Sequence, residues 1–468
     1  MPGAEPTLTQ DQGKTWAQTE FGEAKLGDLR LSKRLTLIAE TLINHPTSSI
    51  PQACGSWNIT KATYRFFDND KVTDQAIIAS HLAATQKRLP SQSTVLAIQD
   101  TTQLDFTHHP ATQGLGILSD LHHQGLFYHP TLLVTPERVP LGLAHHQVWK
   151  RSRKAFGKKQ ARKNRPISKK ESQKWLPSLD QTARLQKENP HLHLVNIADR
   201  EADIFDFFLH AEKLSVDLLV RAAWNRRVDQ PEKYLWDHMK TVPISGNLCI
   251  TVPRKKGQPP REATLSVRYD RVSLKPPKHR SKEKNLKPIT LWAIWAHEEH
   301  PPKGVEPISW MLLTTIPVSS FEEALEKIQW YTCRWQIELF FKILKSGCRI
   351  EARQFETAER IERCLALDAV VAWRVLFVTM LSRHIPHVSS EVLLEPDEWQ
   401  ALYCFIHKTK RPPKTPPSLI EATRMIAQLG GFLGRKSDKH PGPTTIWRGL
   451  QRLQDIAFTW SLCRSLSS

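Results

Sequence analysis

The sequence lacks the features that mark membrane-anchored, secreted and zinc-binding proteins. No apolar run approaches the ~20 residues that a membrane-spanning helix needs, and the N-terminus has no apolar signal core. The seven cysteines are scattered, odd in number and contain no CxxC pair. These absences predict no membrane partner, no zinc site and the reducing cytoplasm as the compartment.

Acidic residues are scarce relative to basic ones. The chain has 47 Asp and Glu against 66 Lys and Arg, a net charge of +19, while its hydrophobic content of 40% is ordinary. Such an excess of positive charge favours a polyanionic partner, and nucleic acid before a membrane surface. At 468 residues the chain exceeds one ordinary core, so two to four domains are expected.

The first part of the chain, residues 1–89, is predicted to be a helical DNA-binding domain. Residues 1–14 are polar and are expected to be disordered, and an apolar pattern typical of helices follows from Trp16. Two short helices are expected around Gly55, with Thr60 as an N-cap. A basic bundle without a DNA contact is the alternative. The predicted DNA contacts of this domain are Arg30, Arg34 and Arg65.

Two aspartates stand at the ends of predicted buried strands. Asp100 follows the apolar run 95–98, and Asp199 follows the strand at 192–197, where a helix begins. Open α/β sheets bind their ligands at the carboxyl ends of such strands, so both aspartates are candidate site residues. Other acids nearby are expected to be surface, capping or solvated residues: Asp105, Asp203 and Asp206.

A third acid, Glu338, lies in the segment 331–345, which has the spacing of an amphipathic helix. Its polar members fall within about 80° of one another, and the apolar members lie on the opposite side. The plain alternative is a surface helix in which Glu338 forms i,i+4 ion pairs with Arg334 and Lys342. The polar face consists of Tyr331, Arg334, Glu338, Lys342 and Lys345, and the apolar face of Ile337, Phe340, Ile343 and Leu344.

Two strand-end aspartates and one helical glutamate together suit phosphoryl transfer on DNA. Such reactions use two divalent ions roughly 3.5–4 Å apart, and Mg²⁺ prefers the oxygen atoms of Asp and Glu. A basic segment at 150–174 offers further positive charge for phosphate. β-like segments between Asp199 and Glu338 predict an insertion of strands before the glutamate helix.

The spacing Tyr-x2-Arg-x3-Glu-x6-Lys at 331–345 resembles the signature of one group of bacterial insertion-sequence transposases. The segments IQDTTQLDF, ADREADIFD and AQLGGF are similar to the same family, and the resemblance covers nearly the whole chain. These are DDE cut-and-paste enzymes that excise DNA through hairpin ends. The resemblance implies that two Mg²⁺ ions, for which Mn²⁺ substitutes, are held by the catalytic residues Asp100, Asp199 and Glu338.

The same resemblance implies roles for residues outside the acidic triad. Trp310 would stack on a base that is flipped out during hairpin formation. The family places an end-binding domain at the N-terminus and a dimerising helical segment at the C-terminus, which implies a homodimer on paired DNA ends. Contacts with the phosphates of those ends are implied for Tyr331, Arg334, Lys342 and Lys345.

The predicted fold is α/β and multidomain, with an RNase H-like catalytic core that carries a β-strand insertion and is flanked by helical domains. The expected domains are 1–89 for end binding, 90–229 and 320–370 for the catalytic core, 230–319 for the insertion and 371–468 for dimerisation. The predicted pairing surface of the last domain consists of Ile446, Leu450, Leu453, Ile456 and Phe458.

The predicted function is DNA transposition in the bacterial cytoplasm, in association with the nucleoid. The protein would bind inverted transposon ends, excise them by nicking, hairpin formation and reopening, and join them to target DNA. A plain RNase H-like nuclease is one alternative; it predicts hydrolysis without strand transfer and leaves the polar face of 331–345 unexplained. A transposase-derived repressor is another, and it predicts a broken triad or a missing N-terminal domain.

Overall fold

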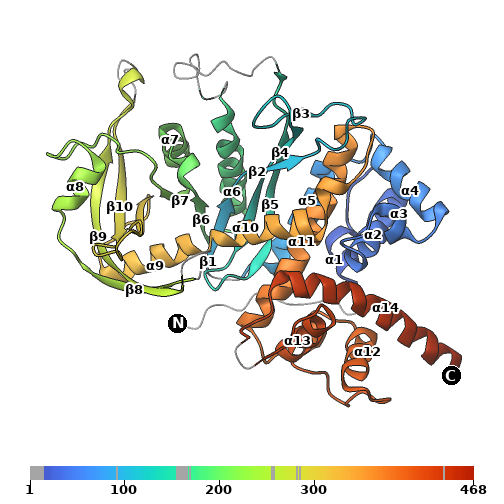
Figure 1. Cartoon of the computed structure of the whole chain (residues 1–468). Helices are drawn as coiled ribbons and strands as arrows, with labels where there is room; N and C mark the ends of the chain where they lie inside the picture. Colours follow the sequence, from blue (N-terminus) through green and yellow to red (C-terminus); the bar gives the residue numbers. More distant parts are fainter. Residues whose placement is uncertain are drawn as a thin grey trace. The chain divides into compact units, whose positions relative to one another are not determined.

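The chain, described here as a computed structural model, divides into two compact units (Figure 1). Unit 1 comprises Met1–Ser93, Thr101–Phe156 and Gln336–Ser468, and unit 2 comprises Thr94–Asp100 and Gly157–Trp335. The structure describes residues 15–90, 93–153, 167, 170–253, 259–280, 283, 286–435 and 438–467. The predictions for residues 1–14 and for most of the basic segment 150–174 lie outside these described residues.

Unit 2 is built on a mixed sheet whose first three strands are parallel. β1 (Thr94–Gln99) pairs with β6 (His193–Ala198), and β6 pairs with β7 (Asp217–Arg221). All three are short apolar runs whose inner residues are buried, as is usual for parallel strands covered on both faces. Within the unit the strands follow the order β1-β6-β7-β11-β10-β9-β8.

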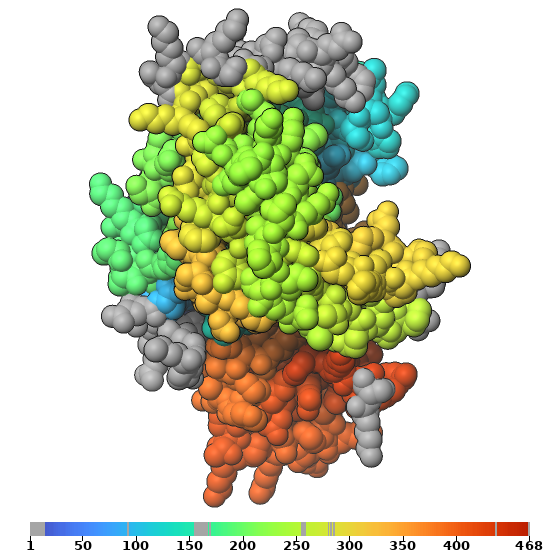
Figure 2. All heavy atoms as spheres, turned by 90° about the vertical axis from the view of Figure 1, so that its left-hand side faces the viewer, coloured from blue at the N-terminus to red at the C-terminus, as the bar shows by residue number. Residues whose placement is uncertain are grey.

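The strands predicted as an insertion continue this sheet. β11 (Ser309–Thr314) pairs antiparallel with β7, and β10 (Ile289–His297), β9 (Arg261–Leu274) and β8 (Gly246–Val252) follow, each antiparallel to the one before. The segment from α8 (Leu235–Thr241) to β10, coloured lime to yellow, occupies much of the face shown in Figure 2. These strands therefore extend the sheet that carries the strand-end aspartates.

Three further helices belong to unit 2: α6 (Leu176–Glu188), α7 (Phe205–Leu214) and α9 (Phe321–Thr332). α9 begins after Ser320, whose side chain accepts a hydrogen bond from the backbone N–H of Glu323 at 3.1 Å. That bond satisfies one of the free N–H groups at the start of the helix. The core of the unit includes the buried side chains of Trp175, Phe207, Phe208, Trp295 and Leu313.

Unit 1 contains a long antiparallel hairpin. β4 (Gln124–Val134) pairs with β5 (Pro140–Trp149), and β2 (Thr102–Asp105) and β3 (Gly116–Ile117) both pair with β4. Every residue of β4 after Gln124 is buried. The hairpin is therefore part of the core of the unit.

The central helix of unit 1 is α11 (Ala358–His384), which contacts β5 and α5 (Asp74–Arg88). By length and composition α11 is long and apolar enough to cross a membrane, which corrects the expectation that no segment reaches this length. However, 94% of its apolar window is buried inside the protein. The core helix of a globular protein has the same properties, so the finding is weak support for a membrane span.

The N-terminal part of unit 1 is helical, as predicted. The two short helices around Gly55 are confirmed as α3 and α4, and Gly55 has a φ of 65°, which residues with side chains rarely adopt. The predicted N-cap is wrong: Ser56 caps α4, and Thr60 lies inside the helix and donates a hydrogen bond to the Ser56 carbonyl. The helices before α5 are α1 (Trp16–Phe21), α2 (Leu29–Asn44), α3 (Ile50–Cys54) and α4 (Trp57–Asp68).

The last three helices, α12 (Pro396–His407), α13 (Leu419–Leu429) and α14 (Pro443–Ser467), complete unit 1. α13 and α14 approach so closely that two glycines are required at their contact. A Cβ atom at Gly449 would lie 1.8 Å from the carbonyl oxygen of Ile426, and a Cβ at Gly430 would lie 2.0 Å from the carbonyl oxygen of Thr445. The first half of α14 therefore packs within its own chain.

This packing corrects the predicted pairing surface. Ile446 and Leu453 are buried and therefore serve the fold of their own chain, whereas Leu450 and Ile456 are half-buried. Phe458, by contrast, is 68% exposed. The exposed apolar stripe on the second half of α14 consists of Phe458, Leu462 and Leu466.

A buried ionic network joins α1 to α5 in unit 1. The carboxylate of Glu20 forms a two-pronged ion pair with the guanidinium of Arg88, and His81 Nδ1 donates to it at 2.6 Å. His81 Nε2 accepts from the backbone N–H of Leu143, so the imidazole is neutral with its proton on Nδ1. Burial raises the pKa of Glu20, but Arg88 and His81 outweigh it and lower this pKa from 4.5 to about 2.

We predict that Glu20→Gln destabilises the protein by about 3 kcal/mol at pH 7, the free energy that corresponds to this shift. Because the folded-state pKa lies below the unfolded one, the contribution is complete above pH ~5 and is lost as the pH falls towards 2. Denaturant titrations of both proteins between pH 7 and pH 3 measure the difference.

The matched control is Glu23→Gln, because Glu23 pairs with Lys87 between the same two parts of the chain but both side chains are exposed. Its effect is expected to be close to zero at every pH. An equal loss for the two variants would contradict the role given to burial.

Candidate active site

The parallel pairing of β1 with β6 brings Asp100 and Asp199 together. The register ends by aligning Ile98 with Ile197, and its extension by two residues would set Asp100 opposite Asp199. Each aspartate directly follows the last residue of its strand, and adjacent strands lie about 4.8 Å apart. The two predicted aspartates thus stand at the same end of two neighbouring strands of unit 2.

Arg334 supplies a positive charge to this pair. Its Nη1 donates a hydrogen bond to Asp100 Oδ2 at 3.0 Å, and the two side chains are only 13% and 18% exposed. The guanidinium carbon also lies 5.5 Å from the ring centroid of Trp335. A largely buried salt bridge therefore holds a cation where two carboxylates meet.

Burial raises the pKa of Asp199 above its ordinary value. The neighbouring Glu201 carboxylate adds to the rise, whereas its backbone N–H, which donates to Asp199 Oδ1 at 2.9 Å, opposes it. Arg334 and Lys174 also favour the charged form, without restoring the ordinary value. An additional positive charge would therefore stabilise the Asp199 carboxylate more than it would stabilise a carboxylate in water.

Trp310 and Tyr331 lie together in the same unit. Trp310, on β11, is half-buried, and its ring centroid is 6.5 Å from that of Tyr331 on α9. Its strand neighbours Met311 and Leu313 point into the hydrophobic core, and Trp310 lies on the other face. Trp310 is therefore not a fully buried core residue.

Arg221 is a member of this group that the sequence did not single out. It is the last residue of β7, the third parallel strand, and its Nη2 donates to the Ser309 carbonyl at 2.8 Å. Burial lowers the pKa of Arg221, and Tyr331 opposes that effect. Burial raises the pKa of Tyr331, and Arg334 and Arg221 limit the rise. The position of Arg221 at the end of an apolar strand is the sequence pattern that could have indicated it.

The predicted helix 331–345 is broken into three parts. α9 ends at Thr332, the next two residues form a turn, and α10 (Trp335–Lys342) is followed by a π-helical turn at Ile343–Gly347. The predicted apolar face is buried as expected. The break falls at Arg334, so this residue is not held in line with Glu338 by one continuous helix.

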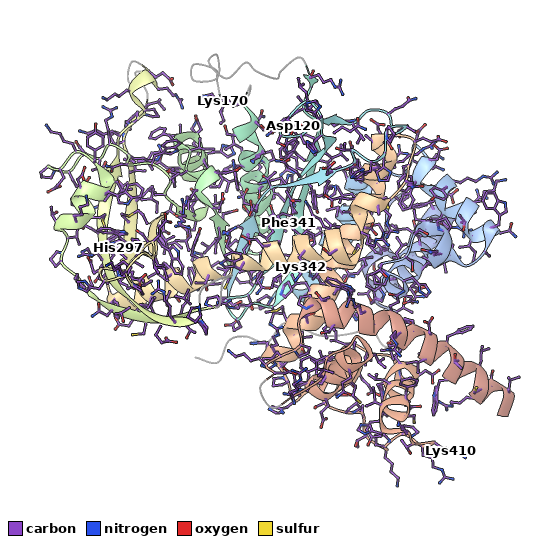
Figure 3. All side chains as sticks on the ribbon, in the orientation of Figure 1. Asp120, Lys170, His297, Phe341, Lys342 and Lys410 are labelled. Atoms are coloured by element: carbon purple, nitrogen blue, oxygen red, sulfur yellow. The ribbon has the colours of Figure 1, made fainter. Side chains whose placement is uncertain are left out.

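Glu338, Lys342 and Lys345 belong to unit 1. Glu338 is half-buried, and Lys342 is exposed beside the buried Phe341 near the end of α10 (Figure 3). Lys345 donates a hydrogen bond to the Gln103 carbonyl and lies 3.3 Å from a carboxylate oxygen of Glu351. Lys345 is thus already engaged by polar groups of its own unit.

Within the described residues, no group of three or more His, Cys, Asp or Glu side chains is close enough together to hold a metal ion. Asp100 and Asp199 lie in unit 2 and Glu338 lies in unit 1, so the three-carboxylate site stays a prediction. The donor set itself fits Mg²⁺, because all three residues offer carboxylate oxygens and Asp199 is poorly compensated in its surroundings.

The acids near the pair have structural roles. Asp203 was predicted as a capping or solvated acid on the helix after Asp199, but it lies before α7 and is buried. It accepts hydrogen bonds from the N–H groups of Ala223 and Trp224 and pairs with Arg226. It therefore shapes the loop after β7. Asp105, which was expected at the surface, is half-buried and accepts a hydrogen bond from the N–H of Thr107 at 2.9 Å.

The predicted DNA contacts of the N-terminal helices are placed differently from one another. Arg30 is exposed but pairs with Asp28 at 3.2 Å, both at the start of α2. Arg34, one turn later, is half-buried. Arg65, on α4, is exposed. These positions leave α4 as the more open of the two helices.

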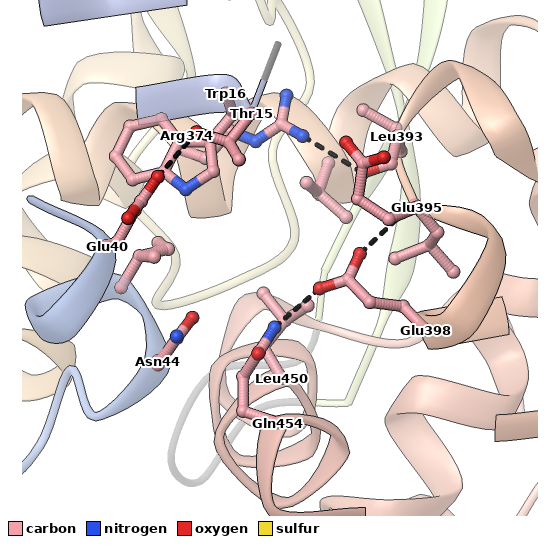
Figure 4. A pocket seen from close by; sticks show the side chains of 13 residues that line it. Thr15, Trp16, Glu40, Asn44, Arg374, Leu393, Glu395, Glu398, Leu450 and Gln454 are labelled. Atoms are coloured by element: carbon pink, nitrogen blue, oxygen red, sulfur yellow. Dashed lines mark hydrogen bonds between the residues drawn. The ribbon is translucent and has the colours of Figure 1, made fainter. Parts of the chain in front are cut away.

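A cavity of about 230 Å³ in unit 1 contains none of the predicted site residues (Figure 4). Arg374 donates to the Leu393 carbonyl at 3.1 Å, and Gln454 donates to Glu398 at 2.6 Å across the cavity wall. Burial lowers the pKa of Arg374 to about 10 and raises the pKa of Glu398. No local pattern in the sequence indicates this cavity, because its lining residues come from five separate helices.

Three family models match successive parts of the chain. A transposase DNA-binding model matches residues 13–72, a transposase DDE domain matches 144–373, and a transposase Tn5 dimerisation domain matches 370–468. Together these matches cover most of the chain. It belongs to the DDE transposases. Asp199 and Glu338 fall inside the matched DDE range, and Asp100 lies before it.

Membership of the DDE transposases implies an RNase H-like core, cleavage and strand transfer of nucleic acid, and divalent metal ions at the site. The DNA-binding and dimerisation domains imply a DNA partner and a dimer. A cryo-EM structure of a piggyBac transposase synaptic complex with hairpin DNA is similar at 10% identity, over 91% of this chain and 68% of that chain. The TM-score of this comparison is 0.35, which is too low to show a shared fold.

The charges of this transposase's aspartate pair predict opposite effects of two neutral substitutions. A double-mutant cycle of Asp100→Asn and Arg334→Gln should give a coupling of about 1–2 kcal/mol in the free energy of unfolding. The reason is that the salt bridge between these two side chains is largely buried. Asp199→Asn should instead raise stability at pH 7, since its raised pKa means that the ionised form opposes folding. Denaturant titration in EDTA measures both effects; zero coupling would contradict the salt bridge.

Proposed function

We propose that the transposase excises a DNA segment through hairpin ends and joins it to target DNA. The observation that carries the proposal is the register of β1 with β6, which sets Asp100 beside Asp199 at the carboxyl ends of two buried strands. Glu338, in the matched DDE domain, is the proposed third acid. The Tyr-Arg-Glu-Lys spacing is the support for the hairpin-forming group.

The three acids would hold two divalent ions, Mg²⁺ with Mn²⁺ as a substitute. When bound, these ions would stabilise the charge on the attacking and leaving oxygens and supply a nucleophilic water. The chain's own contribution is to fix the two aspartates at adjacent strand ends. Burial raises the pKa of Asp199, so its carboxylate would be stabilised further by the charge of the bound ions.

The phosphates of the transposon ends would be bound by Tyr331, Arg334, Lys342 and Lys345. Of these, Lys342 is exposed, while Arg334 is paired with Asp100 in the protein without DNA. A DNA phosphate would take the guanidinium from Asp100, since a bidentate bond to phosphate is as favourable as one to carboxylate. Binding of DNA would thereby free Asp100 for a metal ion.

The proposed reaction exchanges one P–O bond for another at each step. Water attacks the phosphorus at the transposon end and releases a 3′-hydroxyl, which then attacks the opposite strand and closes a hairpin. A second water reopens the hairpin, and the same 3′-hydroxyl attacks a phosphodiester of the target. Two protomers would hold the paired ends in the bacterial cytoplasm, at the nucleoid.

The triad is tested by Asp100→Asn, Asp199→Asn and Glu338→Gln. Each substitution should abolish nicking of end DNA in Mg²⁺ while leaving binding nearly unchanged, because the lost group holds metal rather than phosphate. Gel assays on labelled DNA that score nicks, hairpins and strand-transfer products measure the outcome. The control is Asp105→Asn, which should cleave nearly as well as the wild type.

The alternatives predict different products. A plain nuclease would yield nicks without hairpins or joined target, and a repressor would bind ends without cutting them. Normal cleavage by one of the triad variants would remove that residue from the site.

Trp310→Ala should slow hairpin closure by roughly tenfold or more and leave the first nick nearly unchanged. Hairpin closure requires an extruded base, and stacking on an aromatic ring is worth ~1–3 kcal/mol. The half-buried ring beside Tyr331 is suited to that role. The control is Trp292→Ala on β10, another half-buried tryptophan of the same sheet. Equal slowing of both steps, with a lowered melting temperature, would assign Trp310 to folding.

The dimer surface is tested on the second half of α14. Replacing Phe458, Leu462 and Leu466 together by Glu should prevent paired-end complexes and preserve single-end binding, because the stripe is exposed in one chain. Gel shifts with one and two labelled ends distinguish the two complexes. The control is Thr459→Glu with Ser461→Glu, exposed polar positions of the same helix. Unchanged pairing by the triple variant would place the interface elsewhere.

A further inference from the structure

α4 presents a face of large and polar side chains to solvent. Trp57 is 74% exposed, and Asn58, Lys61 and Arg65 are exposed as well. At 100° per residue these four positions fall within about 100° of one another around the helix. The opposite face packs into unit 1 through Thr60, Thr63, Phe66 and Phe67.

The far end of α4 is held in place by its contacts with unit 1. Arg360, on α11, forms an ion pair with Asp68 at the last residue of α4. Arg363 donates to the Phe67 carbonyl at 2.8 Å, and the ring of Tyr64 contacts Phe355 with centroids 5.6 Å apart. Trp57 and Asn58 lie in the first turn of α4, at the other end of the helix, and both are exposed.

The helix before α4 is short and ends in a tight turn. α3 has five residues, and Gly55, with a φ of 65°, reverses the chain before Ser56 caps α4. Two helices joined by a short turn that contains glycine are typical of helix-turn-helix motifs, in which the second helix enters the major groove of DNA with its N-terminal residues against the base edges. The matched DNA-binding range, 13–72, contains both helices.

We infer that α4 is the helix that reads the sequence of the transposon end, with Asn58 and Trp57 as the specificity-determining residues. This inference rests on the proposed function. The Asn58 amide offers the donor and acceptor that match the major-groove edge of adenine, and the Trp57 ring suits a thymine methyl group. Lys61 and Arg65, further along the same face, carry the charge for phosphates on either side of the groove.

The exposed face of α2 is the competing surface, and it is less suited to reading bases. It carries Lys33 and Leu37, while Arg30 is paired with Asp28. A lysine and a leucine supply charge and apolar area without the paired donor and acceptor of an amide. α2 is therefore assigned to contacts with the DNA backbone.

The test is selection of bound sequences from a randomised duplex DNA library by the full-length protein, at fixed salt and without divalent metal. The wild type should enrich one motif. Asn58→Ala and Trp57→Ala should each lose about tenfold or more of the preference at one or two adjacent base pairs and keep the rest of the motif. Asn58→Arg should change the preferred base pair at that position towards guanine.

Two controls separate base reading from general DNA affinity. Lys61→Ala should weaken binding to all sequences alike. It should also reduce the slope of log affinity against log salt concentration by about 1, the amount expected for one lost phosphate contact. Leu37→Ala removes a comparable exposed apolar side chain from α2 and should leave the motif unchanged.

Three outcomes decide the inference. A motif that stays the same in Asn58→Ala, Trp57→Ala and Asn58→Arg overturns it, as does a motif that changes with Leu37→Ala instead. A wild-type protein that enriches no sequence contradicts end recognition itself, and with it the proposed function. Because the substituted side chains are exposed, thermal melting of all variants is expected to match that of the wild type.

Discussion

Asp100 and Asp199 stand side by side because β1 and β6 pair in parallel, in a register that buried side chains hold on both faces of the sheet. Val95 and Ile98 on one strand and Val195 and Ile197 on the other are fully buried. A slip of one residue would turn one aspartate to the opposite face and expose apolar side chains at the same time. Core packing thus sets the positions of the two strand ends at which the aspartates stand.

Glu20 and Asp199 are two buried acids whose charges are compensated to different degrees. Glu20 has a full set of partners, and its pKa falls to about 2 in spite of burial. Asp199 has a backbone N–H and two cations at a greater distance, and its pKa rises. The first carboxylate stabilises unit 1 by itself. The ionised form of the second would gain more from a further positive charge than a carboxylate in water would.

The strand-end aspartates could be predicted because a short apolar run followed by an acid is a local pattern. The break at Arg334 could not, since Cys333 and Arg334 include neither glycine nor proline. Arg221 escaped notice because its partners come from β11 and α9, far along the chain. The Glu20 network could not be predicted for the same reason, because His81 and Arg88 lie 61 and 68 positions from Glu20 in the sequence.

Other errors arose where two residues satisfy the same local rule. Ser56 and Thr60 are both good N-caps, and the turn at Gly55 decides in favour of Ser56. The apolar positions of α14 have one helical spacing throughout, and sequence does not say which of them meet their own chain. The answer depends on the helices that pack against α14, among them α11, α12 and α13, and Ile446 and Leu453 are buried in the folded chain.

The contact of α13 with α14 has a consequence for the association of subunits. Gly430 and Gly449 contribute no side chain to any interface, yet each occupies a place where one added carbon atom would meet a backbone carbonyl. A mutation to alanine at either position would tilt the far end of α14, where the exposed stripe lies. In a dimer built on that stripe, a substitution buried inside one subunit would therefore weaken the association of the two subunits.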